Sequence, residues 1–430
     1  MINEKNSIGK NITEDESIQW LETEPVKPEG KKRRRRTGKK PLEKHCIRFG
    51  IVLCILVCMY LTIVYSSIPF IKKWRTIYIE TAMTTNSHQW LATLFFPQSV
   101  IDEVMANYQK NLDSQKNLAS TWEGETETET EEDKSENFFE EYWELDSDSF
   151  HEYLRQHPES EQKGYDSILI EDMDKNLGIK TVRGDSLLVL DTANHLMIVG
   201  VSKDAYQGKL AIIKEPEQVE LAKSDSFGTR GQEAESYGQK KDVLLVINAS
   251  GFKDVGGHGS GGEVKGSVII DGTEYSRHTS DSTWKFCGMT KDNKMFVSNY
   301  PYDSVSDYRW GVEFLPALIV DGESVVDGTF GMGIQPRTAV GQTKSGDMLL
   351  LIIDGRQVGY SLGCTVEECK NILMDYKAYQ AMNMDGGSSS VMWYNGNYIT
   401  KSSSVSGRGR FMPDALVVKK AQPEQNTKTE

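Results

Sequence analysis

The feature that most constrains this chain is a run of 23 residues without a charged side chain, FGIVLCILVCMYLTIVYSSIPFI, from Phe49 to Ile71. As an α-helix it would be about 34 Å long, enough to cross the hydrocarbon core of a bilayer. A buried helix of a soluble protein seldom stays apolar on every face for this length. A cleaved signal peptide would have a shorter apolar region and a small-residue cleavage site at its end. We therefore expect an uncleaved transmembrane helix over residues 49–71.

The charges that precede this run predict its orientation. Residues 31–48 contain ten basic side chains and one acid, Glu43, so this stretch carries +9 in a chain whose net charge is −14. An excess of Lys and Arg marks the cytoplasmic side of a membrane span. We expect residues 1–48 to be a basic cytoplasmic tail and the rest of a single-pass protein to lie outside the cell. A basic stretch beside a span also suits the lipid surface, so no nucleic-acid partner is expected.

The chain after the span divides into four parts by composition. Apolar residues at helical spacing predict a juxtamembrane helical segment over 72–110. Residues 111–164 are acidic, repetitive and poor in aliphatic side chains, which predicts a disordered linker. Residues 165–420 alternate short apolar runs with turns, as one folded domain does. Residues 421–430 are expected to be a disordered tail.

The folded part is predicted to be rich in β-strands. Runs such as SLLVLD (186–191), DVLLVINAS (242–250) and DMLLLIIDG (347–355) are typical of strands, and several end on Asp-Gly or contain Asn-Gly, which favours hairpin turns. One helix is predicted by the capping box of Thr365 and Glu368, followed by an apolar face. The expected fold class is α+β, a β-rich domain with few helices, preceded by one transmembrane helix and an acidic linker.

The cysteines and histidines limit the metal chemistry of the outer part. Cys287, Cys364 and Cys369 allow at most one intrachain disulfide there, and no spacing suggests a zinc site. No pair of histidines has the spacing of metal ligands, so a transition metal is not expected. No cofactor is predicted to be required, and a calcium or magnesium ion is left open.

Four polar clusters stand at the ends of apolar strands, where sites are commonly built. They are Asn248-Ala-Ser-Gly-Phe, the glycine-rich stretch 256–266 with Glu263, Gln335-Pro-Arg337 followed by Asp354-Gly-Arg356, and NMDGGSSS over 383–390. The glycine-rich stretch matches GxGxxG, but a strand follows it where a dinucleotide site needs a helix. Guanidinium groups bind phosphate oxygens, and a carboxylate serves as nucleophile or base at an anomeric carbon. The clusters therefore favour a substrate that is both a sugar and a phosphate.

In their order along the chain, these motifs resemble the phosphodiester glycosidase family, to which the lysosomal uncovering enzyme belongs. The series is NASGF, a glycine-rich loop into KGSVIIDG, PALIVDG, QPRTAVGQT, LLLIIDGR, a capped helix, AMNMDGGSSS and GRGRFMPDALVV, over roughly 165–420. The sequence departs from the family pattern at Ala249-Ser250, where a second glycine is usual, and at Met384, where the usual residue is leucine. The resemblance implies a β-rich fold and hydrolysis of a sugar-1-phosphodiester at the anomeric carbon.

The resemblance and the residue chemistry together give the candidate site. Asp385 or Glu263 would act as nucleophile or as base for water, with Asp354 positioning sugar hydroxyls or a metal. Phosphate would be held by Arg337 and by backbone N–H groups of the Gly386–Ser388 turn. The residues expected to bind substrate are Arg337, Asn248, Arg356, Asn383, Gly386, Gly387, Ser388, Ser389 and Arg410.

The expected function is an extracytoplasmic hydrolase of cell-wall or exopolysaccharide metabolism, whose partners are a sugar-phosphate or glycopolymer substrate and the membrane. Two other classes stay open on the sequence. One is a surface protein that binds a glycopolymer without hydrolysing it. The other is a membrane-anchored phosphotransferase that moves glycopolymers from lipid carriers to the wall. Free sugar, transfer to an acceptor, or binding without turnover distinguishes the three.

Overall fold

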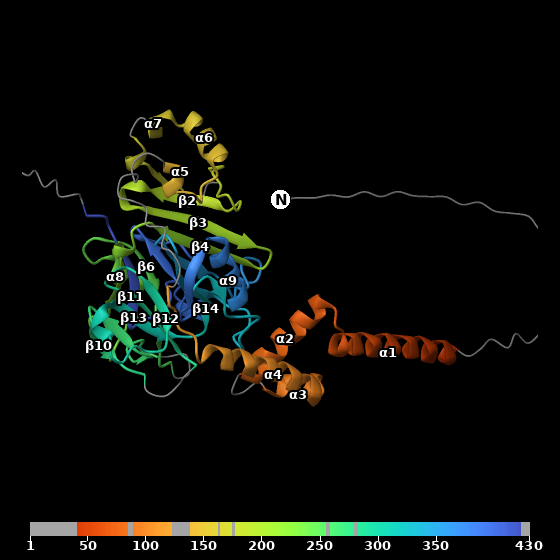
Figure 1. Ribbon diagram of the computed structural model, residues 1–430. Coiled ribbons are helices and arrows are strands. Elements are labelled where there is room, and N and C mark those ends of the chain that lie inside the picture. Colours follow the sequence, from red (N-terminus) through yellow and green to blue (C-terminus); the bar gives the residue numbers. More distant parts are fainter. Residues whose placement is uncertain are drawn as a thin grey trace, which may run out of the picture. The chain divides into compact units, whose positions relative to one another are not determined.

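A computed structural model describes residues 41–84, 89–122, 138–161, 164–173, 177–254, 259–278 and 283–422 (Figure 1). The chain separates into two compact units, 1–60 and 61–430. Residues 1–40 of the predicted cytoplasmic tail, the acidic centre of the predicted linker, part of the glycine-rich stretch and most of the predicted C-terminal tail lie outside the described residues.

The apolar run forms helix α1 (Pro41–Tyr65), and its side chains are largely exposed. Within the described residues, the segment His45–Tyr65 is the one helical stretch long and apolar enough to cross a membrane. The helix ends before the uncharged run does. Pro69 opens the next helix, α2 (Pro69–Thr84), and the Ser66 hydroxyl accepts a hydrogen bond from the Ile68 N–H at 3.1 Å between them. A proline without an N–H is tolerated in a first helical turn and breaks a helix interior, which explains the earlier end.

Three helices follow α1 in the predicted juxtamembrane segment: α2, α3 (Gln89–Phe95) and α4 (Gln98–Gln115). Their contact is a small apolar core that includes Ile79, Ala92 and Ile101. The end of α4 reaches the β-rich part of the molecule, where buried Gln115 donates from Nε2 to the Val325 carbonyl at 2.7 Å. These helices are therefore packed onto the same unit as the strands.

The predicted disordered linker is, in its described C-terminal part, folded. Residues 138–161 form α5 (Phe138–Glu141), α6 (Ser147–Gln156) and α7 (Pro158–Glu161). Phe150 and Leu154 are buried in the main core, and buried Glu144 forms an ion pair with Lys214 at 2.9 Å. The prediction does not hold here because aromatic and aliphatic side chains, absent from the acidic centre, return at helical spacing and supply apolar surface to bury.

The strands form four antiparallel sheets in the described part of the chain. In sheet order the largest is β1-β2-β3-β4-β17-β16-β18-β14-β15, and two five-stranded sheets are β10-β9-β13-β11-β12 and β20-β19-β6-β21-β5, with β7 paired to β8. The strands are β1 (Leu169–Glu171), β2 (Ser186–Asp191), β3 (Leu196–Lys203), β4 (Tyr206–Ile213), β5 (Val219–Lys223), β6 (Val243–Asn248), β7 (Gly251–Phe252), β8 (Val264–Lys265), β9 (Val268–Ile270), β10 (Thr273–Ser276), β11 (Lys285–Thr290), β12 (Met295–Ser298), β13 (Tyr308–Phe314), β14 (Ala317–Val320), β15 (Glu323–Ser324), β16 (Arg337–Thr343), β17 (Met348–Ile353), β18 (Ala378–Asn383), β19 (Met392–Tyr394), β20 (Asn397–Tyr398) and β21 (Asp414–Lys419).

The core explains why these runs became strands. β6, β16 and β17 are buried along their whole length, and both faces of the nine-stranded sheet carry apolar side chains. Helix α9 (Val366–Asp375) covers one face and begins with the predicted capping box of Thr365 and Glu368. The predicted fold class is confirmed: a β-rich α+β unit with one N-terminal apolar helix.

The register of three central strands positions the site. Arg337 at the start of β16 lies opposite Ile353 at the end of β17, and Ala339 of β16 lies opposite Asn383 at the end of β18. Antiparallel pairing therefore brings the start of one strand and the ends of two others to the same edge of the sheet. The polar motifs that follow β17 and β18 emerge at this edge.

Candidate active site

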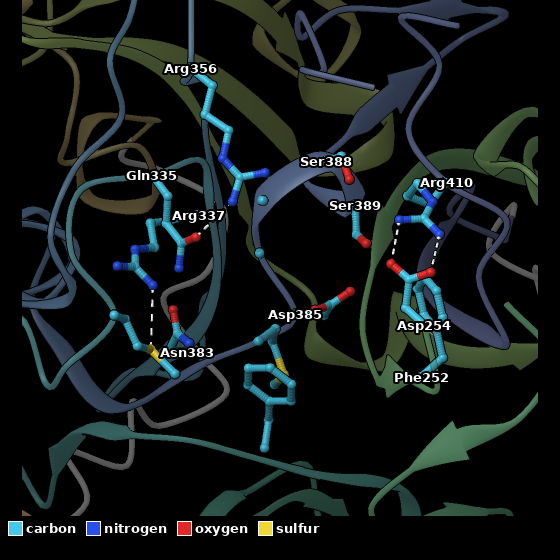
Figure 2. A pocket seen from close by; sticks show the side chains of 15 residues that line it. Phe252, Asp254, Gln335, Arg337, Arg356, Asn383, Asp385, Ser388, Ser389 and Arg410 are labelled. Carbon is cyan, nitrogen blue, oxygen red and sulfur yellow. Dashed lines mark hydrogen bonds and ion pairs between the residues drawn. The ribbon is translucent and has the colours of Figure 1, made fainter. Parts of the chain in front are cut away.

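A cavity of about 270 Å³ opens at this edge of the nine-stranded sheet (Figure 2). Arginine side chains lie on two sides of it, and the Asp385 turn lies between them. Its lining residues are Phe252, Asp254, Phe314, Met332, Gln335, Arg337, Arg356, Asn383, Met384, Asp385, Gly386, Gly387, Ser388, Ser389 and Arg410.

Arg337 is a buried cation held by neutral groups. Its side chain is 1% exposed, and it donates from Nε to the Cys364 carbonyl at 3.1 Å and from Nη2 to the Gly333 carbonyl at 2.6 Å. Its third partner is the Met332 sulfur, 3.4 Å from Nη1. Burial lowers the pKa of the guanidinium, and the nearby Arg356 lowers it further. The negative charge of Glu368 raises this pKa, but none of the hydrogen bonds of Arg337 goes to a carboxylate in the described part of the chain.

Arg356 is the second arginine of the cavity lining whose hydrogen-bond partner is a neutral group. It stands in the loop after β17, and its backbone is in the left-handed region, with φ +59°. Its Nη2 donates to the Gln335 side-chain oxygen at 3.0 Å. Gly387 lies beneath its guanidinium: a Cβ atom on Gly387 would stand 3.2 Å from Arg356 Nη2. Two guanidinium groups at one end of a cavity form a site suited to phosphate oxygens.

Asp385 stands between these cations and the opposite wall (Figure 2). It directly follows Asn383-Met384 at the end of β18, and it is partly open to the cavity. Burial by the surrounding protein raises its pKa to about 6, against hydrogen bonds from Ser389 and the Gly386 N–H and the charge of Arg410, all of which lower it. A carboxyl group with this pKa is partly protonated and partly ionised near neutral pH.

The opposite wall is neutral in charge and partly aromatic. Arg410 forms a bidentate ion pair with Asp254, at 2.8 and 2.9 Å, and its guanidinium lies 5.3 Å from the centre of the Phe252 ring. Phe314 also lines the cavity. An aromatic ring beside a fixed pair of donors and acceptors is a surface suited to a sugar, which presents both C–H groups and hydroxyls.

The two predicted asparagines have different places. Asn383 lines the cavity, donates to the Leu315 carbonyl at 2.7 Å, and has no partner for its Oδ1 in the described part of the chain. Asn248 lies behind the site, 1% exposed, and donates from Nδ2 to the Asp385 carbonyl at 2.6 Å. Its Oδ1 accepts from the Thr338 hydroxyl at 2.8 Å. Asn248 therefore positions Asp385 and does not line the cavity.

Two residues proposed for catalysis lie away from the cavity lining. Glu263 is 59% exposed and forms an ion pair with Lys253. Asp354 is 1% exposed and is used by the loop after β17: Tyr360 donates to its Oδ2 at 2.8 Å and the Lys401 N–H to its Oδ1 at 2.9 Å. Burial raises the pKa of Asp354, and these hydrogen bonds lower it. Asp354 therefore supports the loop that carries Arg356, and neither Asp354 nor Glu263 is among the residues that line the cavity.

The glycine turn differs from the predicted anion-binding turn in one respect. Gly387, with φ +64°, uses its N–H to donate to the Pro336 carbonyl at 2.9 Å. The Gly386 N–H is directed to the Asp385 carboxyl group. Two of the three amides of the predicted turn are therefore engaged within the protein. Ser388 and Ser389 both line the cavity, as predicted for substrate-binding residues.

Several lining residues were not among the predicted site residues, although two of them, Phe252 and Gln335, stand inside the motifs; the others include Asp254, Phe314 and Met332. Phe252 and Gln335 belong to the NASGF and QPRTAVGQT motifs, so their place beside Arg337 was visible in the sequence. Asp254 gave no such signal, since its partner Arg410 is 156 positions away. Within the described residues, no group of three or more His, Cys, Asp or Glu side chains is placed to hold a metal ion.

These features define a class of site: an arginine-lined cavity on a β-rich scaffold, with one carboxyl group at its centre and a mixed aromatic and polar wall. Residues 241–419 match the model of the NAGPA family, phosphodiester glycosidase. The resemblance predicted from the motifs is thereby confirmed over this range. The match supports a phosphodiester glycosidase-type function in general.

Individual relatives are distant. The SPbeta prophage-derived uncharacterized protein YomE of Bacillus subtilis (strain 168) is 27% identical over 220 residues, which is 47% of this chain and 32% of that protein. The chain thus matches about a third of the length of this curated relative.

Three solved structures are similar to part of this chain. The catalytic domain of zebrafish N-acetylglucosamine-1-phosphodiester alpha-N-acetylglucosaminidase, auto-inhibited by its pro-peptide, is 20% identical with a TM-score of 0.43, over 53% of this chain and 82% of that one. A hypothetical protein from Synechocystis is 12% identical with a TM-score of 0.41, over 56% and 65%. A putative exported protein from Burkholderia pseudomallei is 13% identical with a TM-score of 0.37, over 54% and 76%.

Proposed function

We propose that this protein hydrolyses a sugar-1-phosphodiester at the anomeric carbon. The observation that carries the proposal is the pair of cavity arginines, Arg337 and Arg356, whose described partners are neutral, beside the carboxyl group of Asp385. A buried cation without a counter-ion is costly unless its ligand is an anion. The family match over 241–419 supports the same substrate class.

In the proposed reaction the phosphodiester binds at the arginine end and the sugar lies toward Phe252 and the Arg410–Asp254 pair. The bond between C1 of the sugar and the bridging oxygen breaks, and its electron pair stays with the phosphate. Arg337 and Arg356 stabilise the charge that develops on the departing phosphate monoester. Because phosphate is a good leaving group, the reaction needs no strong general acid, which fits a cavity where the second acid, Asp254, is tied to Arg410.

Asp385 acts at the anomeric carbon, C1. As a base it takes a proton from the water that attacks C1; as a nucleophile it forms a glycosyl ester that water then hydrolyses. In either case one water is consumed, C1 gains its hydroxyl, and the products are the free sugar and a phosphate monoester. The pKa of about 6 leaves most of Asp385 ionised at neutral pH, as both roles require.

The proposed setting is the outer face of a membrane. Helix α1 would anchor the chain through His45–Tyr65, and the basic residues before it would remain in the cytoplasm. The substrates we propose are cell-wall or exopolysaccharide components that contain a sugar-1-phosphodiester.

The experiment that tests the proposal uses the full-length chain in detergent. It is incubated with the p-nitrophenyl ester of a sugar-1-phosphate or with a uridine-diphosphate sugar, with and without EDTA and with and without a glycan acceptor. Release of free sugar in wild type and its loss in Asp385→Asn support hydrolysis. Transfer to the acceptor without free sugar, or binding without turnover, would overturn the proposal in favour of a phosphotransferase or a binding protein.

A further inference from the structure

The loop before β16 connects the juxtamembrane helices to the arginine end of the cavity. Residues 328–333 run from the N-terminal side of α9 to the guanidinium of Arg337. At the far end, the Met332 sulfur and the Gly333 carbonyl are two of the three partners of Arg337. A displacement of this loop would therefore remove two of the three contacts that hold the Arg337 guanidinium in place.

Helix α2 contacts this loop through a buried acid. Glu80 is 4% exposed, and its Oε2 accepts hydrogen bonds from the Thr329 hydroxyl and, at 3.5 Å, from the Gly331 N–H. Burial raises the pKa of Glu80, and the two hydrogen bonds lower it. Glu80 lies four residues before the end of α2 and away from water. Burial of its carboxyl group costs free energy, and its hydrogen bonds to the loop offset that cost.

The packing between helix and loop is close. Thr84 donates from its hydroxyl to the Gly331 carbonyl at 2.7 Å. A Cβ atom on Gly331 would lie 2.7 Å from Thr84 Cγ2, and one on Gly333 would lie 2.6 Å from Thr81 Oγ1. The Phe330 ring packs edge to face on Tyr108 of α4, with centroids 6.2 Å apart. Thr329, Phe330, Gly331 and Gly333 of the loop are thus in contact with the juxtamembrane helices.

We propose that Glu80 is a positioning residue for Arg337, acting through loop 328–333, so that the helices next to the membrane anchor form part of the support of the catalytic cavity. This inference rests on the proposed function, because it takes Arg337 as the phosphate-binding group. It implies that the helical segment is required for full activity and does more than space the domain from the membrane.

The test compares three variants of the full-length chain in detergent. Glu80→Ala removes both hydrogen bonds, and Glu80→Gln keeps an oxygen acceptor of similar shape. The matched control is Ser120→Ala, which removes the buried hydrogen bonds of the Ser120 hydroxyl with the Val297 backbone, at 2.7 and 2.9 Å, and with the Gln380 side chain, at 2.9 Å, none of which involves the loop. Hydrolysis rates, thermal unfolding and labelling of Arg337 by phenylglyoxal, located by peptide mass spectrometry, are measured for each.

The expected result for Glu80→Ala is a fall in kcat/KM of about tenfold to a hundredfold, since small displacements of a binding group have effects of that size. Arg337 should become reactive to phenylglyoxal in the same variant. Glu80→Gln should stay within about threefold of wild type, and Ser120→Ala should melt earlier but keep its kcat/KM and its protected Arg337. If Glu80→Ala does not fold, Thr329→Val, which removes the hydroxyl and keeps the shape, replaces it.

Two results would overturn the inference. One is a Glu80→Ala or Thr329→Val variant with wild-type kinetics and an unreactive Arg337. The other is an equal loss of activity in Ser120→Ala, which would mean that Glu80 contributes only to the general stability of the fold. If wild type hydrolyses no diester, the proposed function fails, while the phenylglyoxal measurement still tests whether Glu80 positions Arg337.

Discussion

The guanidinium of Arg356 lies over the backbone of Gly387, so that a Cβ atom there would stand 3.2 and 3.3 Å from its two terminal nitrogens. Gly387 also has φ +64°, a conformation that costs an L-residue about 1–2 kcal/mol. Gly387→Ala should therefore displace Arg356 and raise KM for a sugar-1-phosphodiester by about tenfold in steady-state assays. The control is Gly396→Ala, which has φ +92° with open space around it and should lose stability alone. Equal kinetic losses in both variants would contradict a phosphate-binding Arg356.

Replacement of the buried cation tests the arginine end directly. Arg337→Lys keeps the charge but cannot reach the Cys364 and Gly333 carbonyls with one planar group, so we expect kcat/KM to fall by about 10²–10³-fold. The matched control is Arg309→Lys, since Arg309 also donates to backbone carbonyls, those of Pro216 and Glu217, at 2.9 and 3.1 Å but away from the cavity. A normal rate for Arg337→Lys would rule out a specific role for the guanidinium.

The raised pKa of Asp385 predicts the pH dependence of the reaction. A base or nucleophile must be ionised, and with a pKa of about 6 the ionised fraction rises from pH 5 to pH 7 and then levels off. We expect log kcat/KM to follow that curve in wild type. Asp385→Asn should lower the rate by about 10²–10⁴-fold, and the residual rate should not rise between pH 5 and pH 7. A wild-type rate that falls over the same range would instead indicate that protonated Asp385 acts as an acid.

The oxidation state of Cys364 and Cys369 tests whether the domain lies outside the cytoplasm. Both are buried, their sulfur atoms are 3.2 Å apart, and they occupy the two positions that contact each other at a helix start, before and after the capping box. Outside the cytoplasm, exchange with a disulfide oxidant would join them. We expect both to resist N-ethylmaleimide in denaturant until a reductant is added, while Cys287 reacts at once. Labelling of all three without reductant would contradict an extracytoplasmic domain.

Local signals predicted the turns and the capped helix well. Asp271-Gly272, Asp321-Gly322 and Asn395-Gly396 all have positive φ at both positions, as two-residue hairpins require. The Asp-Gly pair that ends the predicted strand 347–355, Asp354-Gly355, does not make such a turn. Its carboxyl group is bound instead by Tyr360 and the Lys401 N–H, contacts that a local dipeptide cannot reveal.

The same difference between local and long-range contacts explains which residues of the candidate site could be predicted. Arg337, Arg356 and the Asp385 turn could be found because each follows or begins an apolar strand of the central sheet. Asp254 and its partner Arg410 could not be paired from the sequence, because 156 positions separate them. The contact between Glu80 and Thr329 could not be predicted for the same reason, since 249 positions separate them. Residues 138–161 were assigned to a linker because the acidic average over 111–164 concealed their aromatic side chains.

The most direct test of the central claim asks which bond is broken. Wild-type protein is incubated with a sugar-1-phosphodiester in water enriched in ¹⁸O, and both products are analysed by mass spectrometry. Attack at the anomeric carbon predicts that the label appears in the free sugar and not in the phosphate monoester, and that Asp385→Asn yields neither product at a comparable rate. Label in the phosphate would show cleavage of the phosphorus–oxygen bond and would contradict the account.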